Sequence, residues 1–518
     1  MSRSMTSPAM PVQAPGRVAG SPFRSRVPGA AAALGLAVVA GLGAATVMPR
    51  GPATRGEVVA ALVAGLLLGV AGGAVMRSRW SVLALPAAFA VTVELARLGV
   101  TGPSVDLPRL DSTVGVLALV LGRGVAAVLQ LLPIAVGAAY GAGLARRSAG
   151  VTSRRRAAVI AGRVTATVLV VALVALGAVL VRPPRTAPIL GADGRAVPGS
   201  VSELATVRLG GHDQRVLIRG RSTSNPVVLY LSGGPGQSDL GYTRALMPTM
   251  EDDVVFAVWD QRGTGTSYAA LDPEDTWTLD RAVTDTVELS EYLRRRFGQR
   301  PIVLVGNSWG TLLGTLAVQR RPDLYAAYVG AGQMVDVAES DRIIYRDMLA
   351  LAQRTGDRAL AGRLRDSGPP PYADVYGYAT QLELYDRLAP YPRTAWFESH
   401  RPGGLDGNGV PEYGPLDKVN KLKGLFDMGA VMYPQIQAVD LRRDVPRLQV
   451  PVYLVEGRHE LRARLDPARA WFAMLDAPAK QWVEFRGSGH VPHFEEYARF
   501  RELLLGTVLP AAGATTTG

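Results

Sequence analysis

The chain contains no cysteine and only five histidines among its 518 residues. The absence of cysteine excludes disulfide bonds, thiolate nucleophiles and cysteine-ligated metal sites. Charged residues are also scarce, at 19%, and the mean hydropathy is slightly positive, +0.14. Soluble domains usually contain about 25% charged residues. The composition therefore favours a chain with a membrane-associated part.

Acidic residues are rare in the N-terminal third. Residues 1–186 hold 19 arginines and no lysine, but only four acids. The net charge of +12 therefore comes from this apolar segment, and the remainder of the chain is slightly acidic. A nucleic-acid-binding protein would carry a basic stripe on a folded domain, whereas arginines beside apolar runs are typical of membrane proteins. We expect no nucleic-acid partner.

Several apolar runs in this third are long enough to cross a bilayer, which takes about 20 residues. The arginine-rich N-terminal tail, second loop and fourth loop should face the cytoplasm. With five spans, the C-terminal part then lies outside the cytoplasm. A count that is wrong by one span would place it inside instead. We read the helices as an anchor in a multi-pass cell-membrane protein. The predicted spans are 29–48, 57–76, 80–99, 115–143 and 158–181, within a transmembrane domain at 29–182 that follows a cytoplasmic tail at 1–28.

A different pattern begins after a linker at 183–200. Residues 204–219 alternate apolar and polar around Gly210-Gly211, which predicts a β-hairpin. Short apolar runs then alternate with helical patterns, which predicts an α/β fold with a mostly parallel sheet. The predicted strands are 227–231, 254–259, 302–305, 326–329, 452–455 and 482–485, and the predicted helices are 279–296, 310–320, 464–475 and 494–508.

Residues 332–446 interrupt this alternation with helical stretches at 337–354, 373–387 and 416–428. We interpret them as a helical cap over the carboxyl edge of the sheet, where open α/β sheets bind ligands. The core is thereby divided into a first part at 201–331 and a second part at 447–510, followed by a disordered tail at 511–518.

The sharpest motif is Gly306-Asn307-Ser308-Trp309-Gly310, between a predicted strand and a predicted helix. A tight turn in this context exposes the serine hydroxyl, and glycines on either side avoid clashes. We predict that Ser308 is a nucleophile. The alternative is an ordinary turn between a strand and a helix.

A nucleophilic serine needs a base, and His490 is in the best position to be one. It follows the strand 482–485 in Gly487-Ser488-Gly489-His490, at the same edge of the sheet. His493 is the rival, and it is otherwise expected to be a surface residue in the first turn of the last helix.

The base in turn needs a carboxylate to fix its tautomer. Glu460 follows the strand 452–455 and is the predicted acid. Glu456 is expected inside the strand, and Asp466 is expected to cap the next helix. The chain order serine, acid, histidine is that of α/β hydrolases.

An oxyanion hole requires two backbone N–H donors. Trp309, directly after the nucleophile, offers one. We expect the other from Gly233 or Gly234 in Ser232-Gly233-Gly234-Pro235-Gly236, which follows the strand 227–231. The alternative for this segment is a simple loop.

These motifs resemble the proline iminopeptidase-like branch of the α/β hydrolases. Ser232–Gly236 is similar to the family's His-Gly-Gly-Pro-Gly, and Trp259–Ser267 (Trp-Asp-Gln-Arg-Gly-Thr-Gly-Thr-Ser), Gly306–Gly310 and Gly489-His490 also match. The resemblance covers residues 200–508 and implies an α/β-hydrolase fold with a helical cap. Ser232 stands where the family has histidine and Glu460 where it has aspartate, so the substrate stays open.

In that family, acidic cap residues bind the free amino terminus of the substrate. The resemblance makes Glu339 the candidate for this role. The alternative is a carboxylate that faces solvent on a cap helix.

We therefore predict a membrane-anchored serine hydrolase that cleaves ester or amide bonds in a small molecule or peptide, without metal or cofactor. Removal of an N-terminal residue is the form of this activity that the resemblance implies. A lipid or acyl esterase and a non-catalytic membrane sensor on a hydrolase fold are the alternatives.

Overall fold

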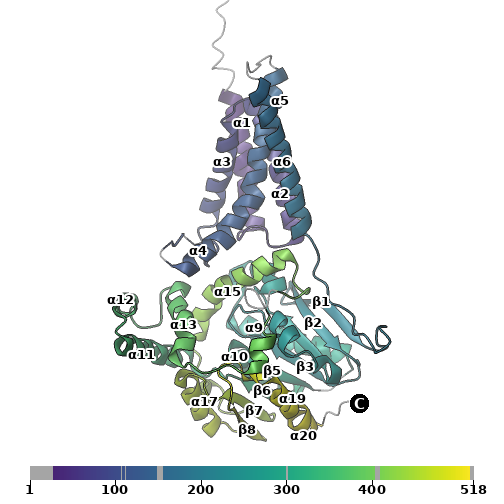
Figure 1. The fold of residues 1–518 in the computed structure, drawn as a ribbon, viewed down its shortest axis with the longest axis vertical. Helices are drawn as coiled ribbons and strands as arrows, with labels where there is room; N and C mark the ends of the chain where they lie inside the picture. Colours follow the sequence, from purple (N-terminus) through teal and green to yellow (C-terminus); the bar gives the residue numbers. More distant parts are fainter. Residues whose placement is uncertain are drawn as a thin grey trace, which may run out of the picture.

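The computed structural model describes residues 27–106, 108–110, 112–148, 156–298, 301–402 and 409–513. A bundle of helices from the N-terminal third stands on a larger α/β domain (Figure 1). The predicted N-terminal tail up to residue 26, and residues 514–518 of the predicted C-terminal tail, lie outside the described residues.

The bundle corresponds to the predicted spans. The fourth apolar run forms one continuous helix, in which α4 passes through the π-helical turns η1 and η2 into α5. Within the described residues, four helices are long and apolar enough to cross a membrane: Pro28–Val47, Arg55–Met76, Thr113–Ser148 and Ile160–Leu180. The elements are α1 (Val27–Val47), α2 (Arg55–Met76), α3 (Ser81–Ala96), α4 (Thr113–Leu119), η1 (Val120–Gly124), η2 (Ala127–Leu131), α5 (Leu132–Ser148) and α6 (Arg156–Leu180).

The third predicted span is shorter than expected. Residues 80–99 were predicted to cross the bilayer, but α3 holds only 16 residues, about 24 Å of helix against a hydrocarbon core of about 30 Å. Its helix ends at Ala96, and the chain then turns toward the α/β domain, where Thr101 N–H donates a 2.7 Å hydrogen bond to Glu274. The helix nevertheless runs beside α1 along the bundle (Figure 1).

Glycines allow two helices of the bundle to touch. A Cβ atom at Gly69 of α2 would lie 2.2 Å from the carbonyl oxygen of Ile134, and one at Gly137 of α5 would lie 2.3 Å from that of Leu66. Large apolar side chains meanwhile point outward, such as Val39, Leu67 and Val171, each more than 60% exposed. The bundle thus packs through small residues and presents an apolar exterior, as membrane helices do.

The α/β domain is built on one eight-stranded sheet of order β1-β2-β4-β3-β5-β6-β7-β8. β1 and β2 form the predicted hairpin, β2 is antiparallel to β4, and the remaining neighbours are parallel. All predicted strands are present, most of them extended by one or two residues at an end. Their bounds are β1 (Val201–Leu209), β2 (His212–Gly220), β3 (Val227–Leu231), β4 (Val255–Asp260), β5 (Ile302–Asn307), β6 (Tyr325–Ala331), β7 (Val452–Gly457) and β8 (Lys480–Phe485).

Helices cover both faces of the sheet, because its central strands are apolar on both sides. In β3, Leu229 packs into one buried cluster with α9 and α10, whereas its neighbour Tyr230 packs into another with α7 and α19. The single helix predicted at 494–508 is instead divided into α18, α19 and the π-helical turn η7. These elements are α7 (Leu240–Leu246), α9 (Leu279–Arg296), α10 (Trp309–Arg320), α17 (Arg462–Met474), α18 (Pro492–Glu495), α19 (Tyr497–Leu503) and η7 (Leu504–Val508).

A helical cap lies between β6 and β7, as predicted. It contains three helices that the sequence pattern did not indicate, α12, α14 and α16. Its longest helix, α15, lies directly under the bundle (Figure 1), where Asn420 donates to the carbonyl of Ala53 at 2.7 Å and Lys423 to that of Arg50 at 2.8 Å. The cap helices are α11 (Val337–Thr355), α12 (Arg358–Ser367), α13 (Val375–Leu388), α14 (Ala395–His400), α15 (Pro415–Ile436) and α16 (Leu441–Asp444).

Candidate active site

Ser308 lies at a strained turn between β5 and α10. Its backbone has φ +51° and ψ −119°, a conformation that costs a non-glycine residue on the order of 1–3 kcal/mol. A Cβ atom at Gly306 would lie 2.4 Å from the carbonyl oxygen of Gly310, and one at Gly310 would lie 2.2 Å from that of Leu231. Both flanking glycines are therefore required by close backbone approach, and the turn has the geometry of a nucleophile elbow.

The turn directs Ser308 into a cavity of about 390 Å³ under the cap. Its side chain lines the cavity, although the residue is only 8% exposed. The hydroxyl lies 3.7 Å from the sulfur of Met334. The core, the cap and the bundle all contribute to the lining, the bundle through Val114 of α4. The serine thus faces a largely apolar cavity.

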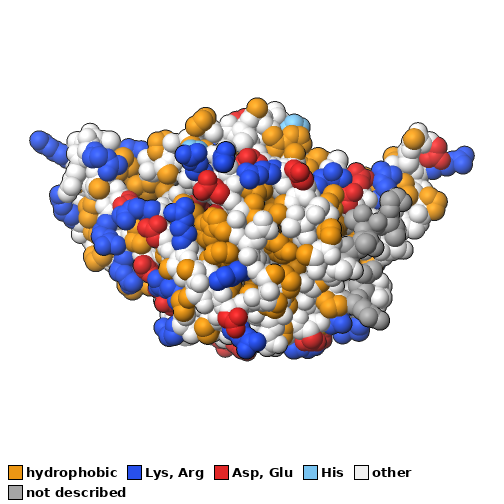
Figure 2. Space-filling model, turned by 90° about the horizontal axis from the view of Figure 1, so that it is seen from below, with side chains coloured by type: hydrophobic (Ala, Val, Ile, Leu, Met, Phe, Trp, Pro, Cys, Tyr) orange, Lys and Arg blue, Asp and Glu red, His pale blue; other side chains and the backbone are white. Residues whose placement is uncertain are grey.

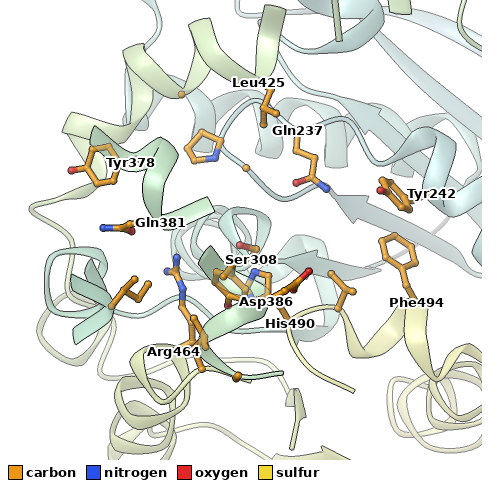
Figure 3. A pocket seen from close by; sticks show the side chains of 18 of the residues that line it. Gln237, Tyr242, Ser308, Tyr378, Gln381, Asp386, Leu425, Arg464, His490 and Phe494 are labelled. Carbon is orange, nitrogen blue, oxygen red and sulfur yellow. The ribbon is translucent and has the colours of Figure 1, made fainter. Parts of the chain in front are cut away.

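His490 lines the same cavity, and Figure 3 shows it beside Ser308. Its Nδ1 is in a short hydrogen bond with Oε2 of Glu460. A carboxylate at Nδ1 favours the tautomer in which Nδ1 carries the proton, and this leaves Nε2 as the basic nitrogen. The predicted serine, histidine and acid, which are distant in the chain, are therefore brought together at the carboxyl edge of the sheet.

Glu460 is buried, with 5% exposure, and accepts further hydrogen bonds from Tyr385 Oη at 2.6 Å and from the Leu461 N–H at 2.7 Å. Burial alone would raise its pKa. The neighbouring imidazole and the three hydrogen bonds outweigh burial, so the pKa of Glu460 is lowered from its ordinary value. The carboxylate stays ionised beside the imidazole, as the acid of a triad must.

The rival histidine does not reach the cavity lining. His493 is completely buried rather than exposed in the first turn of the last helix, which corrects the expectation for this residue. Its Nε2 pairs with Tyr230 Oη at 2.9 Å. Burial, with a smaller contribution from His490, lowers its pKa to about 3. A base with so low a pKa is unsuited to take a proton at neutral pH.

The structure separates the two glycine candidates for the oxyanion hole. The Gly233 N–H donates a 3.1 Å hydrogen bond to Asp239. Gly234 lines the cavity, and its N–H meets no acceptor among the residues that the structure describes. Trp309 is the first residue of α10, where N–H groups lack intrahelical acceptors. Among the predicted donors, Gly234 and Trp309 are therefore the two whose N–H groups are not bound to another described residue.

One residue that the sequence pattern did not single out connects these motifs. The Gln261 side chain donates to the Ser232 carbonyl at 3.3 Å and accepts from the Trp309 indole at 2.8 Å. It thus fixes the loop after β3 against the start of α10. Its place in the Trp259–Ser267 motif was the signal that could have found it.

Three other acids occupy different places. Glu456 lies inside β7 as expected, is 1% exposed and accepts from the Gln333 N–H at 2.8 Å. Asp466 was expected to cap a helix, but α17 begins at Arg462 with Leu461 as its N-cap, so Asp466 lies within the helix. Glu339 pairs with Arg442 at 2.7 Å and is not among the residues that line the cavity. The structure does not bring it to Ser308.

Comparison with known proteins agrees with this architecture. The family model for the alpha/beta hydrolase fold matches residues 226–497, more than half of the chain. The chain therefore belongs to the α/β-hydrolase fold family. The helical bundle precedes the matched residues.

Individual relatives are more distant. A protein of Bacillus subtilis (strain 168) described as the probable aminopeptidase YbaC is 28% identical over 311 residues, covering 59% of this chain and 96% of that protein. A proline iminopeptidase of Lactobacillus delbrueckii subsp. bulgaricus is 25% identical over 296 residues, covering 55% of this chain and 91% of that protein. The crystal structure of a proline iminopeptidase from Mycobacterium smegmatis has 17% identity and a TM-score of 0.38, and covers 60% of this chain and 99% of its own.

Proposed function

We propose that this chain is a membrane-anchored serine hydrolase that cleaves ester or amide bonds. The observation that carries the proposal is the placement of His490. Its Nδ1 is bound to a buried carboxylate, while its ring lines the same cavity as a serine on a strained turn. This combination supplies an oriented base beside a presented nucleophile.

The geometry supports a two-step acyl transfer. Ser308 Oγ attacks the carbonyl carbon of the substrate while His490 Nε2 takes the hydroxyl proton. The oxyanion that forms accepts hydrogen bonds from the N–H groups of Gly234 and Trp309. The imidazolium, stabilised by Glu460, then gives its proton to the departing alcohol or amine. A water molecule repeats the sequence on the acyl-enzyme and regenerates Ser308.

Removal of N-terminal residues from peptides is one form of this reaction. It is supported by the printed descriptions of the relatives, of which one is a probable aminopeptidase and another a proline iminopeptidase. Glu339 does not supply the carboxylate that would hold a substrate amine, because it is engaged by Arg442 outside the cavity lining. Asp386 does line the cavity, and its carboxylate is 77% exposed and pairs with Arg393 at 2.7 Å.

Hydrolysis of acyl esters is the second candidate, and one observation favours it. The cavity wall includes Val114, which belongs to α4 at the base of the bundle, together with apolar side chains of the cap such as Leu425 and Phe426. An apolar wall next to the membrane-side helices suits an acyl chain.

The membrane anchor is supported by the outward-facing apolar side chains of the bundle. The face of the α/β domain turned away from the bundle looks different, since charged side chains of both signs are spread among apolar ones (Figure 2). We propose that the bundle spans the cell membrane and that the α/β domain lies outside the cytoplasm.

Labelling with a fluorophosphonate probe tests the enzymatic proposal. Such a probe bonds only to an activated serine, so we expect the intact protein to be labelled and the Ser308→Ala variant to stay unlabelled. Ser399→Ala, on the exposed side of α14, is the matched control and should be labelled normally. A folded intact protein that resists the probe and turns over neither aminoacyl nor acyl-ester substrates would instead favour the non-catalytic sensor.

A further inference from the structure

Arg464 is a cation of the cavity wall that forms no ion pair within 4.0 Å among the described residues, although Asp341 and Glu460 lie near it. It projects from α17 into the cavity, and Figure 3 shows its guanidinium between Gln381 and Ser308. Its Nε and Nη1 atoms are shielded from solvent and have no hydrogen-bond partner among the described residues. The Nε2 atom of Gln381, a residue only 6% exposed, is also shielded and has no hydrogen-bond partner among the described residues. Three donor atoms without a hydrogen-bond partner therefore belong to two side chains that line the same cavity.

The acids around Arg464 are already committed. Asp341 accepts hydrogen bonds from Tyr433 at 3.0 Å and from Gln437 at 3.0 Å. Glu460 is bound to His490 and Tyr385. Across the described ranges, no carboxylate lies within 4.0 Å of the Arg464 nitrogens.

Several other arginines of the cap and of α17 are paired with acids of the chain. Arg442 contacts Asp440 at 2.9 Å, Arg393 contacts Asp386 at 2.7 Å, and Arg462, two residues before Arg464, is paired with Asp347. A shielded cation with unused donors is costly unless an anion meets it. The shielded donors of Arg464 that have no hydrogen-bond partner therefore point to a ligand that the chain does not itself supply.

We propose that Arg464 and Gln381 bind a carboxylate of the substrate while its ester or amide carbonyl lies at Ser308; this rests on the proposed hydrolase function. The planar guanidinium fork matches the two oxygens of a carboxylate. The side-chain amide of Gln381 adds a further donor. The favoured substrates are then esters or amides that carry a free carboxylate. In a short peptide, the C-terminal carboxylate meets this requirement.

The carboxylate can belong to either side of the scissile bond, and matched esters separate the two. Mono-4-nitrophenyl glutarate carries it on the acyl side, and 4-nitrophenyl valerate is its neutral counterpart. 3-Acetoxybenzoate carries it on the leaving group, and 3-methylphenyl acetate is its neutral counterpart. In the full-length protein, we expect one charged ester to exceed its counterpart in kcat/KM by about 10- to 100-fold, the range expected for hydrogen bonds to a charged group.

Substitution of the arginine should remove this preference. Arg464→Gln should lower kcat/KM for the preferred charged ester by about 10- to 100-fold. It should change kcat/KM for the neutral counterpart by less than about 3-fold. Arg464→Lys keeps the charge but loses the fork, and should recover part of the preference. Arg462→Gln on the same helix is the matched control. If Arg464 has a purely structural role, such as support of Tyr385 and Glu460, Arg464→Gln would instead lower kcat/KM equally for both esters of a pair. That result would overturn the proposal.

Binding separates this inference from the function on which it rests. In the Ser308→Ala background, isothermal titration with monomethyl glutarate and with the neutral methyl valerate requires no turnover. We expect selective binding of the carboxylate that Arg464→Gln abolishes. Equal weak binding of both compounds, or a wild-type enzyme that treats the esters of each pair alike, overturns the carboxylate site. Absence of phosphonate labelling overturns the hydrolase, while the titration still decides the carboxylate site.

Discussion

Tyr385 in the cap donates a 2.6 Å hydrogen bond to Oε1 of Glu460 in the core, while Oε2 of the same carboxylate holds His490. The ring of Tyr385 also lies 5.4 Å from that of His490. The acid of the proposed triad is therefore positioned from two domains at once. The cap covers the site and also fixes the orientation of its acid.

Removal of this phenol should weaken catalysis without abolishing it. In Tyr385→Phe, Glu460 loses one of the hydrogen bonds that lower its pKa, and its orientation toward His490 relaxes. We expect kcat/KM to fall about 10-fold, which corresponds to about 1.4 kcal/mol. We also expect the acidic limb of the pH–rate profile to move to higher pH. Steady-state kinetics on a neutral ester measure both effects.

A second tyrosine serves as the control for that experiment. Tyr345 donates a 3.1 Å hydrogen bond to the Leu364 carbonyl within the cap and is not among the residues that line the cavity. Tyr345→Phe should change thermal stability slightly and leave the pH–rate profile in place. If both variants behave alike, the contact between Tyr385 and Glu460 has no role in the reaction.

Elements that depend on local sequence were predictable. The turn at Ser308 is defined by two glycines between a strand and a helix, and the conflict of any added Cβ with neighbouring backbone explains why the pattern is specific. Buried parallel strands give continuous apolar runs, so their positions followed from the pattern as well. The sheet and the order of the site residues were therefore available before any coordinates.

Contacts between distant segments were not predictable in this way. Tyr385 and Arg464 enter the cavity from α13 and α17, and nothing in the local pattern distinguishes them from other tyrosines and arginines. His493 resembled a surface residue because it lies three positions after His490, but the packing of Tyr230 and Phe494 around it buries it. Glu339 was assigned by resemblance, and the ion pair with Arg442 was not visible in the sequence.

The strain at Ser308 should be measurable as stability. Glycine adopts a positive φ freely, whereas alanine retains the strain of the serine. We expect Ser308→Gly to unfold at a higher temperature than Ser308→Ala, by about 1–2 kcal/mol in free energy of unfolding, although neither variant has activity. Thermal unfolding of both proteins in the same detergent tests this. Equal stability would mean that the turn relaxes when the hydroxyl is removed.

His493 should make the protein less stable in acid. Its pKa is about 3 in the folded chain and about 6.5 in an unfolded one. Between these values the unfolded state binds a proton that the folded state does not, so stability falls as pH falls from about 6.5 toward 3. The contribution of this residue to the slope is at most about 1.4 kcal/mol per pH unit.

A difference between two pH titrations isolates this contribution. His493→Asn should be less stable at neutral pH, because it loses packing in the core, but its free energy of unfolding should decline less steeply between pH 6.5 and 4.5. His400→Asn, at an exposed imidazole stacked on Trp396, is the control. Parallel curves for wild type and His493→Asn would contradict a histidine that stays neutral in the folded protein.

Arg50 should hold the bundle on the α/β domain. Its side chain is fully buried and pairs with Asp272 at 3.1 Å, with Asp427 at 3.8 Å and with Glu274. Arg50→Ala would leave three carboxylates facing one another, and loss of one partner from a buried ion pair costs about 3–5 kcal/mol. We expect a lower unfolding temperature and faster proteolysis of the 183–200 linker. Arg79→Ala, at an exposed position in the loop after α2, should have neither effect.

The topology of the membrane domain is testable because the chain has no cysteine of its own. Asp193 lies in an exposed turn after α6, and Arg79 lies in an exposed loop between α2 and α3. With five crossings, Asp193→Cys in intact cells should react with a membrane-impermeant maleimide, and Arg79→Cys should react only after lysis. The unmodified chain, which cannot react, is the control.

Two other outcomes of this labelling each identify a different error. Reaction of Arg79→Cys alone would mean that the whole orientation is reversed. Protection of both cysteines would mean that α3, with its 16 residues, does not cross, since the segments after it would then change sides. We expect the crossing, because Thr101 beyond α3 donates a hydrogen bond to Glu274 of the α/β domain at 2.7 Å. That contact requires the end of α3 and the α/β domain to lie on one side of the membrane.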